Sequence, residues 1–181
     1  MSATKPDIVK REFVYKGYHN LVVDTLSLPG KQPIEYTMLQ VEHDATVILA
    51  ATKNNKFVFT REYRHPPQRY LIGLPGGRID LKEDPMAAAK RELEEETGYT
   101  AADYLLLGIA YPCPAVSNQK IHYYLAKDAA PHGKMEREPY ELMETLELSQ
   151  DELFARIAQG QEADGILFPA LAFYSSAPFR S

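Results

Sequence analysis

Residues 77–99 read GRIDLKEDPMAAAKRELEEETGY, and this stretch defines a loop, a helix and a group of carboxylates together. Asp84 can cap the helix and Pro85 suits its first turn, whereas Gly98 supplies the left-handed residue that ends it. The pattern therefore predicts a helix from about Pro85 to Thr97.

Three acidic side chains lie on one stripe of this helix, because Glu92, Glu95 and Glu96 are separated by i+3 and i+4 spacings. Two unit charges about 6 Å apart repel by about 3 kcal/mol at an effective dielectric of about 20. Ion pairs with Arg91 and Lys90 on a solvated helix would offset part of that repulsion. A bound cation would offset more of it.

The run LPGG at residues 74–77 precedes the helix, and its glycines let the backbone approach a ligand or a metal closely. Hard oxygen ligands around such a loop suit Mg²⁺ or Mn²⁺, which bridge phosphate oxygens. Residues 77–99 resemble the signature of the Nudix hydrolases, G-x5-E-x7-R-E-U-x-E-E-x-G-U, where U is a bulky aliphatic residue. Every fixed position is present, and only Tyr99 departs, at the final position.

This resemblance implies a role for each residue type in the signature. Glu92 and Glu96 would bind the metal directly. Glu95 would either bind the metal or contact the residues that bind it. The carbonyl of Gly76 would be a further ligand. Glu83 and Arg91 would hold the loop to the helix through an ion pair.

The flanks of the signature point to a subfamily. Residues 61–67, REYRHPP, resemble the Q-Y/F-R-x-P segment of ADP-ribose pyrophosphatases. That resemblance implies that Arg64 contacts the substrate, for which a guanidinium is a suitable partner. A surface ion pair with Glu62 or Asp80 is the alternative for this arginine.

Downstream, residues 113–118 read CPAVSN and resemble the subfamily's D-P-G-x-S-N loop, which implies that Pro114 and Ala115 bind substrate. Ala115 stands where the subfamily commonly has glycine, and Gly76 stands where it commonly has alanine. These departures leave hydrolases of other nucleoside diphosphate sugars open.

Hydrolysis needs a water made nucleophilic by metal ions or by a carboxylate base. In the family such a base lies on a loop well after the signature. Similarity to the subfamily's E-x-x-E-V-x-x-x-P region makes Glu141 the candidate, with Glu138 and Glu144 as competitors. For each of the three, a solvated surface acid is the alternative.

The resemblance covers nearly the whole chain and implies two parts: an N-terminal antiparallel β extension at residues 1–42, and a Nudix hydrolase domain at 43–181. It also implies a homodimer in which the N-terminal sheet is exchanged and aromatic residues stack on the base. Tyr36, with His19 or Tyr18, is the candidate for stacking. An ordinary core or surface role is the alternative.

The rest of the chain predicts an α/β protein: an α/β/α sandwich of the Nudix type around a mixed sheet. A capping box at Ser149 and Glu152 begins a second helix, and a third is expected at 166–176. Strands are expected at 11–15, 20–28, 34–41, 46–52, 56–63, 71–74, 104–110, 120–126 and 142–148.

Composition excludes several classes of function. The 181 residues carry a net charge of −5, with no basic block that would bind nucleic acid or an anionic membrane. No signal peptide or long apolar span is visible, so we expect a cytoplasmic protein. The single cysteine, Cys113, excludes an internal disulfide and fits a reducing compartment.

These observations favour a Mg²⁺-dependent pyrophosphatase that cleaves ADP-ribose or a related nucleoside diphosphate sugar to a nucleoside monophosphate and a sugar phosphate. Mn²⁺ could replace Mg²⁺. One alternative is a non-catalytic sensor of ADP-ribose-like ligands. A nucleoside triphosphate pyrophosphatase is another, although it would not need the N-terminal sheet.

Overall fold

The computed structural model describes residues 5–137 and 141–176, and the chain divides into two compact units. The first unit contains Met1–His43 together with Cys113–Gln119. The second contains Asp44–Pro112 and Lys120–Ser181. The segment Cys113–Gln119 therefore folds with the N-terminal sheet, although it lies in sequence between two strands of the second unit.

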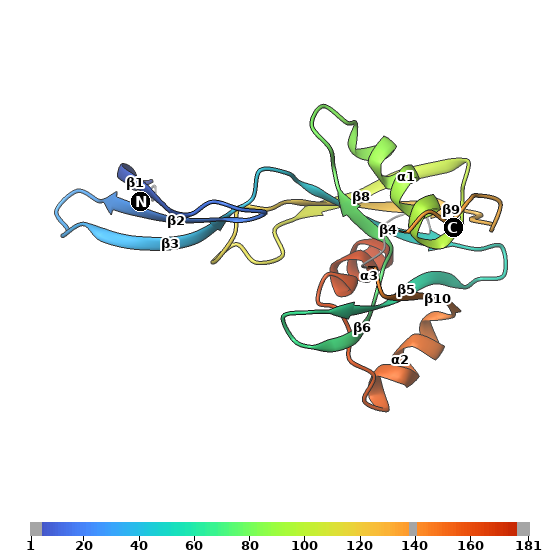
Figure 1. Ribbon diagram of the computed structural model, residues 1–181. Coiled ribbons are helices and arrows are strands. Elements are labelled where there is room, and N and C mark those ends of the chain that lie inside the picture. Colours follow the sequence, from blue (N-terminus) through green and yellow to red (C-terminus); the bar gives the residue numbers. More distant parts are fainter. Residues whose placement is uncertain (1–4, 138–140, 177–181) are drawn as a thin grey trace. The chain divides into compact units, whose positions relative to one another are not determined.

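The first unit is an antiparallel sheet in the order β1-β2-β3 (Figure 1). Its strands are β1 (Asp7–Tyr15), β2 (Asn20–Ser27) and β3 (Ile34–Gln40). β1 begins four residues before the predicted strand, and all nine of its residues are exposed. Arg11 and Asp24 face each other across β1 and β2, and two guanidinium nitrogens donate to the carboxylate at 2.7 and 2.6 Å.

The second unit is built on a mixed sheet of seven strands. The path is β10-β5-β4-β9-β8, with β6 paired to β5 and β7 paired to β4. Only the β4–β9 pair is parallel among the strand pairs of the described residues. The strands are β4 (Ala45–Ala51), β5 (Phe57–Arg64), β6 (Arg69–Gly73), β7 (Gly76–Arg78), β8 (Asp103–Ala110), β9 (Ile121–Lys127) and β10 (Met143–Leu148).

Helices cover both faces of this sheet: α1 (Pro85–Thr97) on one side, and α2 (Gln150–Ala158) with α3 (Leu167–Ser176) on the other (Figure 1). Alternating residues of β4 produce the two layers, since successive side chains of a strand point to opposite faces. Leu49 packs in the cluster that includes Leu153 and Leu171, whereas Ile48 packs in the cluster that includes Leu93. The predicted α/β/α sandwich with a mixed sheet is therefore confirmed.

The capping residues behave as their sequence positions predict. Helix α1 has the predicted bounds, with Asp84 as its N-cap and Gly98, at φ 72°, as its C-cap. Ser149 and Glu152 form both hydrogen bonds of the capping box at the start of α2. Pro169 lies in the first turn of α3. Backbone N–H groups in the first turn have no acceptor within the helix, so the missing N–H of proline costs no helical hydrogen bond there.

One local prediction was wrong: the glycine segment after Leu74 is not a simple loop. Gly76–Arg78 forms strand β7, which pairs antiparallel with β4 in the register Val47 to Gly76. A Cβ on Gly76 would lie 2.2 Å from the carbonyl oxygen of Thr46, so only glycine can lie this close to β4. The glycines that suggested a loop in the sequence are the residues that permit this pairing.

Candidate active site

Helix α1 is fixed against β7 by a short contact and a hydrogen bond. A Cβ on Gly77 would lie 2.5 Å from Oε1 of Glu92, so this carboxylate lies directly against the strand backbone. The backbone N–H of Gly76 donates to Oε2 of Glu96 at 2.9 Å. Two of the predicted metal-binding glutamates therefore contact the adjacent glycines Gly76 and Gly77.

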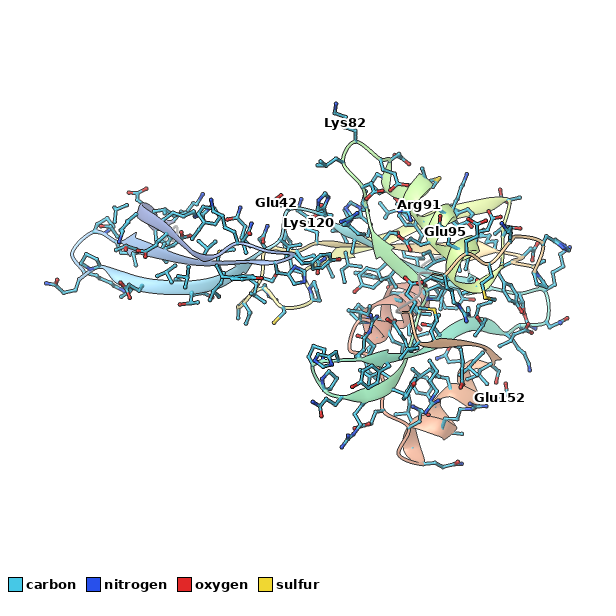
Figure 2. The ribbon with its side chains drawn as sticks, viewed as in Figure 1. Glu42, Lys82, Arg91, Glu95, Lys120 and Glu152 are labelled. Carbon is cyan, nitrogen blue, oxygen red and sulfur yellow. The ribbon has the colours of Figure 1, made fainter. Side chains whose placement is uncertain are left out.

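Arg91 is the centre of the charge network on α1 (Figure 2). Its guanidinium makes a bidentate pair with Glu83, with both N–O distances 3.0 Å. Its Nη1 also donates to Glu92 at 2.8 Å and to Glu95 at 3.0 Å. The expected Glu83–Arg91 ion pair is present, and the hydrogen bond from Arg91 lowers the pKa of Glu83.

Glu96 is the most buried carboxylate of the group, with 6% of its surface exposed. Burial holds the pKa of Glu96 well above its usual value, and the hydrogen bond from Gly76 opposes that shift. The negative charges of Glu92, Glu141 and Glu62 raise the pKa of Glu96 further. Burial also raises the pKa of Glu92, against the opposing charge of Arg91.

The electrostatic coupling extends the group beyond α1 to Glu141 and Glu62. Glu141, the predicted base, raises the pKa values of Glu96, Glu92 and Glu62 through its negative charge. Of its competitors, Glu144 lies 3.6 Å from the guanidinium of Arg61 with an exposed side chain. Glu138 lies outside the residues that the structure describes.

Glu62 is the member that the sequence reasoning missed, because it was considered only as a partner of Arg64. Burial is the main cause that raises the pKa of Glu62. A signal was available: Glu62 lies four positions after Val58 on β5 and so on the same face of the strand, and Val58 packs in the cluster beneath α1. The parity of β5 therefore directs Glu62 to the face that carries α1.

Arg64 adjoins this group through Glu62. Its Nη1 donates to Glu62 at 2.9 Å, and its Nε lies 3.5 Å from Asp164. The ion pair with Glu62, the alternative to substrate binding, is present, whereas Asp80 pairs with Arg78. About 40% of the Arg64 side chain is still exposed, so part of the guanidinium remains accessible to a ligand.

The donors of this group suit a hard divalent cation, because they are partly buried carboxylates whose negative charges act on one another. Glu92 and Glu95 contact Arg91, and Glu96 contacts the N–H of Gly76. Within residues 5–137 and 141–176, no three acidic, histidine or cysteine side chains already form a metal-binding cluster. The types of side chain present, and not a preformed metal-binding cluster, therefore support the assignment of a divalent cation to this group.

The other predicted substrate residues lie in the first unit. The hydroxyl of Tyr36 donates to the carbonyl of Ala115 at 2.6 Å, so the structure brings these two residues together. Pro114 precedes Ala115 in the same segment. His19 stacks edge-on with Tyr18 in the β1–β2 turn, at a centroid distance of 4.7 Å, and does not join Tyr36.

The distance between His19 and Tyr36 follows from the register of the sheet. Asn20 pairs with Gln40 and Asp24 pairs with Tyr36, so the two candidates are more than four strand positions apart. The five positions from His19 to Asp24 correspond to about 17 Å at the rise of a β-strand. Tyr36 therefore contacts the loop of residues 113–119, whereas His19 lies in the turn between β1 and β2.

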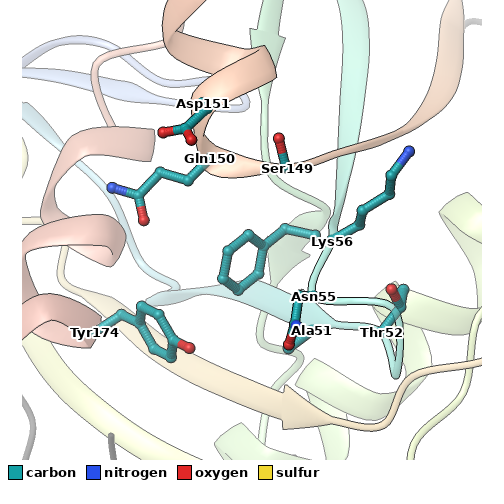
Figure 3. A pocket seen from close by; sticks show the side chains of 9 residues that line it. Ala51, Thr52, Asn55, Lys56, Ser149, Gln150, Asp151 and Tyr174 are labelled. Atoms are coloured by element: carbon teal, nitrogen blue, oxygen red, sulfur yellow. The ribbon is translucent and has the colours of Figure 1, made fainter.

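A pocket of about 430 Å³ lies in the second unit between the β4–β5 turn and the start of α2, with Tyr174 of α3 at its side (Figure 3). Lys56 and Asp151 contribute opposite charges to its lining. Its lining residues include none of the carboxylates that surround Glu96.

Among the described residues, no helix is long and apolar enough to span a membrane.

Comparisons of the sequence with known proteins point to the same family as the signature around α1. The family model described as NUDIX domain matches residues 41–170. An ADP-ribose pyrophosphatase of Bacillus subtilis (strain 168) is 28% identical over 155 residues, which cover 84% of this chain and 83% of that protein. A methanol dehydrogenase activator of Bacillus methanolicus is 30% identical over 153 residues, which cover 83% and 82%.

A solved structure described as an ADP compounds hydrolase has the same fold. It superposes with a TM-score of 0.85 and covers 97% of this chain and 95% of its own, at 22% sequence identity.

Proposed function

Because this chain belongs to the Nudix family, we propose that it hydrolyses the diphosphate bond of ADP-ribose or a related nucleoside diphosphate sugar. The products would be a nucleoside monophosphate and a sugar phosphate. The observation that carries the proposal is the group of carboxylates around Glu96, which keeps every acid of the signature and is coupled to Glu141.

The cation would be Mg²⁺, with Mn²⁺ as the alternative. Glu92 and Glu96 would hold it, together with Glu95 and the carbonyl of Gly76. When bound, it would neutralise charge on the diphosphate and lower the pKa of a coordinated water. Arg91 supports this arrangement because it fixes the loop through Glu83 and orients Glu92 and Glu95.

The chain's own residues would carry the remaining steps. Glu141 would accept a proton from the attacking water, since its charge acts on Glu96 and Glu92. Arg64 would bind the anionic substrate with its exposed edge, while Glu62 and Asp164 hold the rest of the guanidinium. Substrate binding by Tyr36, Pro114 and Ala115, and by His19, completes the proposal.

The N-terminal extension at residues 1–42 would form the contact of a homodimer, and residues 43–181 would form the hydrolase domain. Its support is the exposure of apolar side chains on a sheet too thin to bury them. These side chains are Ile8, Val9, Phe13, Val14, Tyr15, Ile34 and Leu39. We expect the protein to act in the cytoplasm, without a nucleic-acid or membrane partner.

Two substitutions on one helix test the activity. Glu96→Gln should abolish turnover of ADP-ribose with Mg²⁺, because it removes the charge of the most buried acid. Glu94→Gln is the matched control: its carboxylate accepts a hydrogen bond from the N–H of Lys134 and is not part of the charge group around Glu96. Turnover of ADP-ribose, ADP-glucose, GDP-mannose, UDP-glucose and NADH is measured, and the products are identified.

The alternatives give different results in the same assay. Full activity of Glu96→Gln would contradict the assignment of the site. Binding of ADP-ribose without turnover by the natural chain would indicate a sensor. Preference for a nucleoside triphosphate would indicate the third function.

A further inference from the structure

The segment before Glu141 runs along the C-terminal end of α1 and supplies its last carbonyl groups with donors. These carbonyls have no partner within the helix. The N–H of Gly133 donates to the carbonyl of Gly98 at 3.0 Å, and that of Glu136 donates to the carbonyl of Glu95 at 2.8 Å. The segment is therefore tied to the turn of α1 that carries two of the signature acids.

Arg137 continues this contact with its side chain. Its Nε donates to the carbonyl of Glu96 at 2.7 Å. Its Nη1 donates to the carbonyl of Met143 at 2.8 Å, and its Nη2 donates to Oγ1 of Thr145 at 2.7 Å. One guanidinium thus joins the last turn of α1 to the first residues of β10.

All three acceptors are uncharged oxygens, which distinguishes Arg137 from Arg91 and Arg64. A surface arginine that only balances charge would face a carboxylate. Three short bonds to backbone and hydroxyl oxygens in fixed directions require the planar fork of a guanidinium, which a lysine ammonium cannot reproduce. The contact therefore specifies geometry more than charge.

The residues next to Glu141 are tied down on the other side. The N–H of Met143 donates to the carbonyl of Glu141 at 3.1 Å, and the N–H of Tyr63 donates to the carbonyl of Leu142 at 3.0 Å. Met143 also pairs with Glu62 in the β10–β5 ladder. Arg137 and β5 together hold the backbone that carries Glu141.

We propose that Arg137 is a positioning residue for the hydrolysis: it fixes Glu141 relative to Glu96 by bonding α1 to the start of β10. This inference rests on the proposed function. It assigns Arg137 no contact with substrate or cation. Its effect should therefore fall on turnover and leave substrate binding nearly unchanged.

The test compares Arg137→Ala, Arg137→Lys and the natural chain, all at full length, with ADP-ribose and Mg²⁺. Displacement of a catalytic group by about 1 Å costs about 10²-fold in rate, so kcat of Arg137→Ala should fall by about that factor with KM nearly constant. Arg137→Lys should lose less but remain below the natural chain. Arg156→Ala, at an exposed arginine of α2, is the matched control and should keep full activity.

Guanidinium ions at concentrations far below those that unfold the protein provide a readout that a merely structural role would not give. They should restore part of the turnover of Arg137→Ala and leave the turnover of Arg156→Ala unchanged. Amide hydrogen exchange of residues 141–145 gives a second readout, independent of activity. Exchange should be faster in Arg137→Ala and slow again when guanidinium is added.

Each outcome decides the inference. Natural kcat in Arg137→Lys and in Arg137→Ala overturns it, as does a loss that appears only in KM. If Arg137→Ala does not fold, Arg137→Lys decides, because it keeps the charge and lacks the fork. No turnover by the natural chain overturns the proposed function together with this inference, whereas a natural chain that is active and insensitive to Arg137 overturns the inference alone.

Discussion

Substitution of Gly77 by alanine should separate activity from stability at the active site. The added Cβ would lie 2.5 Å from Oε1 of Glu92, and 2.6 Å from both Cδ and Oε2. Rotation of the carboxylate cannot relieve three short contacts, so the whole group must move. Reaching an ordinary contact of 3.4 Å from 2.5 Å requires a displacement of about 0.9 Å.

The cost of that displacement falls on Glu92 and not on the backbone. The φ angle of Gly77 lies outside the left-handed range, unlike that of Gly98, so alanine is conformationally acceptable there. The flexible end of a glutamate can move, and we expect a loss of less than about 1 kcal/mol in the free energy of unfolding. Misplacement of Glu92, the proposed metal ligand, should lower kcat/KM by about 10²-fold.

The assay measures ADP-ribose hydrolysis against Mg²⁺ concentration, together with the thermal midpoint with and without Mg²⁺. Gly77→Ala should need more Mg²⁺ and should gain less thermal stability from it. Gly165→Ala is the control, since a Cβ there has no atom within 4 Å. A Gly77→Ala protein with natural activity and natural Mg²⁺ dependence would refute the contact between β7 and the glutamates proposed to bind the metal.

Three further predictions concern Glu96, Asp84 and Asn118. Without divalent cations, the unfolding temperature should rise as the pH falls towards 4.5, the ordinary pKa of a glutamate, because the raised pKa of Glu96 favours the protonated folded state between its ordinary and raised values. Glu96→Gln should flatten this profile, and an unchanged slope would contradict the burial of that charge. Asp84→Ala should lower the free energy of unfolding by about 1 kcal/mol in a urea titration, because two N–H groups of α1 lose their acceptor, and no change would exclude the cap. Asn118→Ala should raise KM for ADP-ribose with little change in kcat, because the loop of residues 113–119 loses both side-chain bonds to Val41; an unaltered KM would argue against a substrate role for that loop.

Short-range signals predicted much of the fold, because capping depends on residues that are close in sequence. Asp84, Gly98 and Ser149 gave helix boundaries that the structure reproduces within one or two residues. Strand β7 was missed because its existence depends on β4, and Gly76 and Gly77 suggest a turn when they are considered alone.

The partly predicted site shows the same limit. The signature spacing identified Glu92, Glu96 and the Glu83–Arg91 pair, which lie within one loop and one helix. Glu62 and Arg137 reach the site through strand register and a long-range hydrogen bond, and a single sequence does not show either. The aromatic ring makes Tyr36 a candidate in the sequence, whereas in the structure its hydroxyl donates to the carbonyl of Ala115, 79 positions away.

The membership of Cys113–Gln119 in the first unit limits how this protein can be shortened. Leu39 donates its N–H to the carbonyl of Val116, and Val41 exchanges two hydrogen bonds with the side chain of Asn118. An expression clone that starts at residue 44 would retain this seven-residue segment and delete the strand that orders it. A minimal catalytic fragment would therefore need a redesigned β8–β9 connection, and loss of activity after simple truncation would not show that the N-terminal sheet is catalytic.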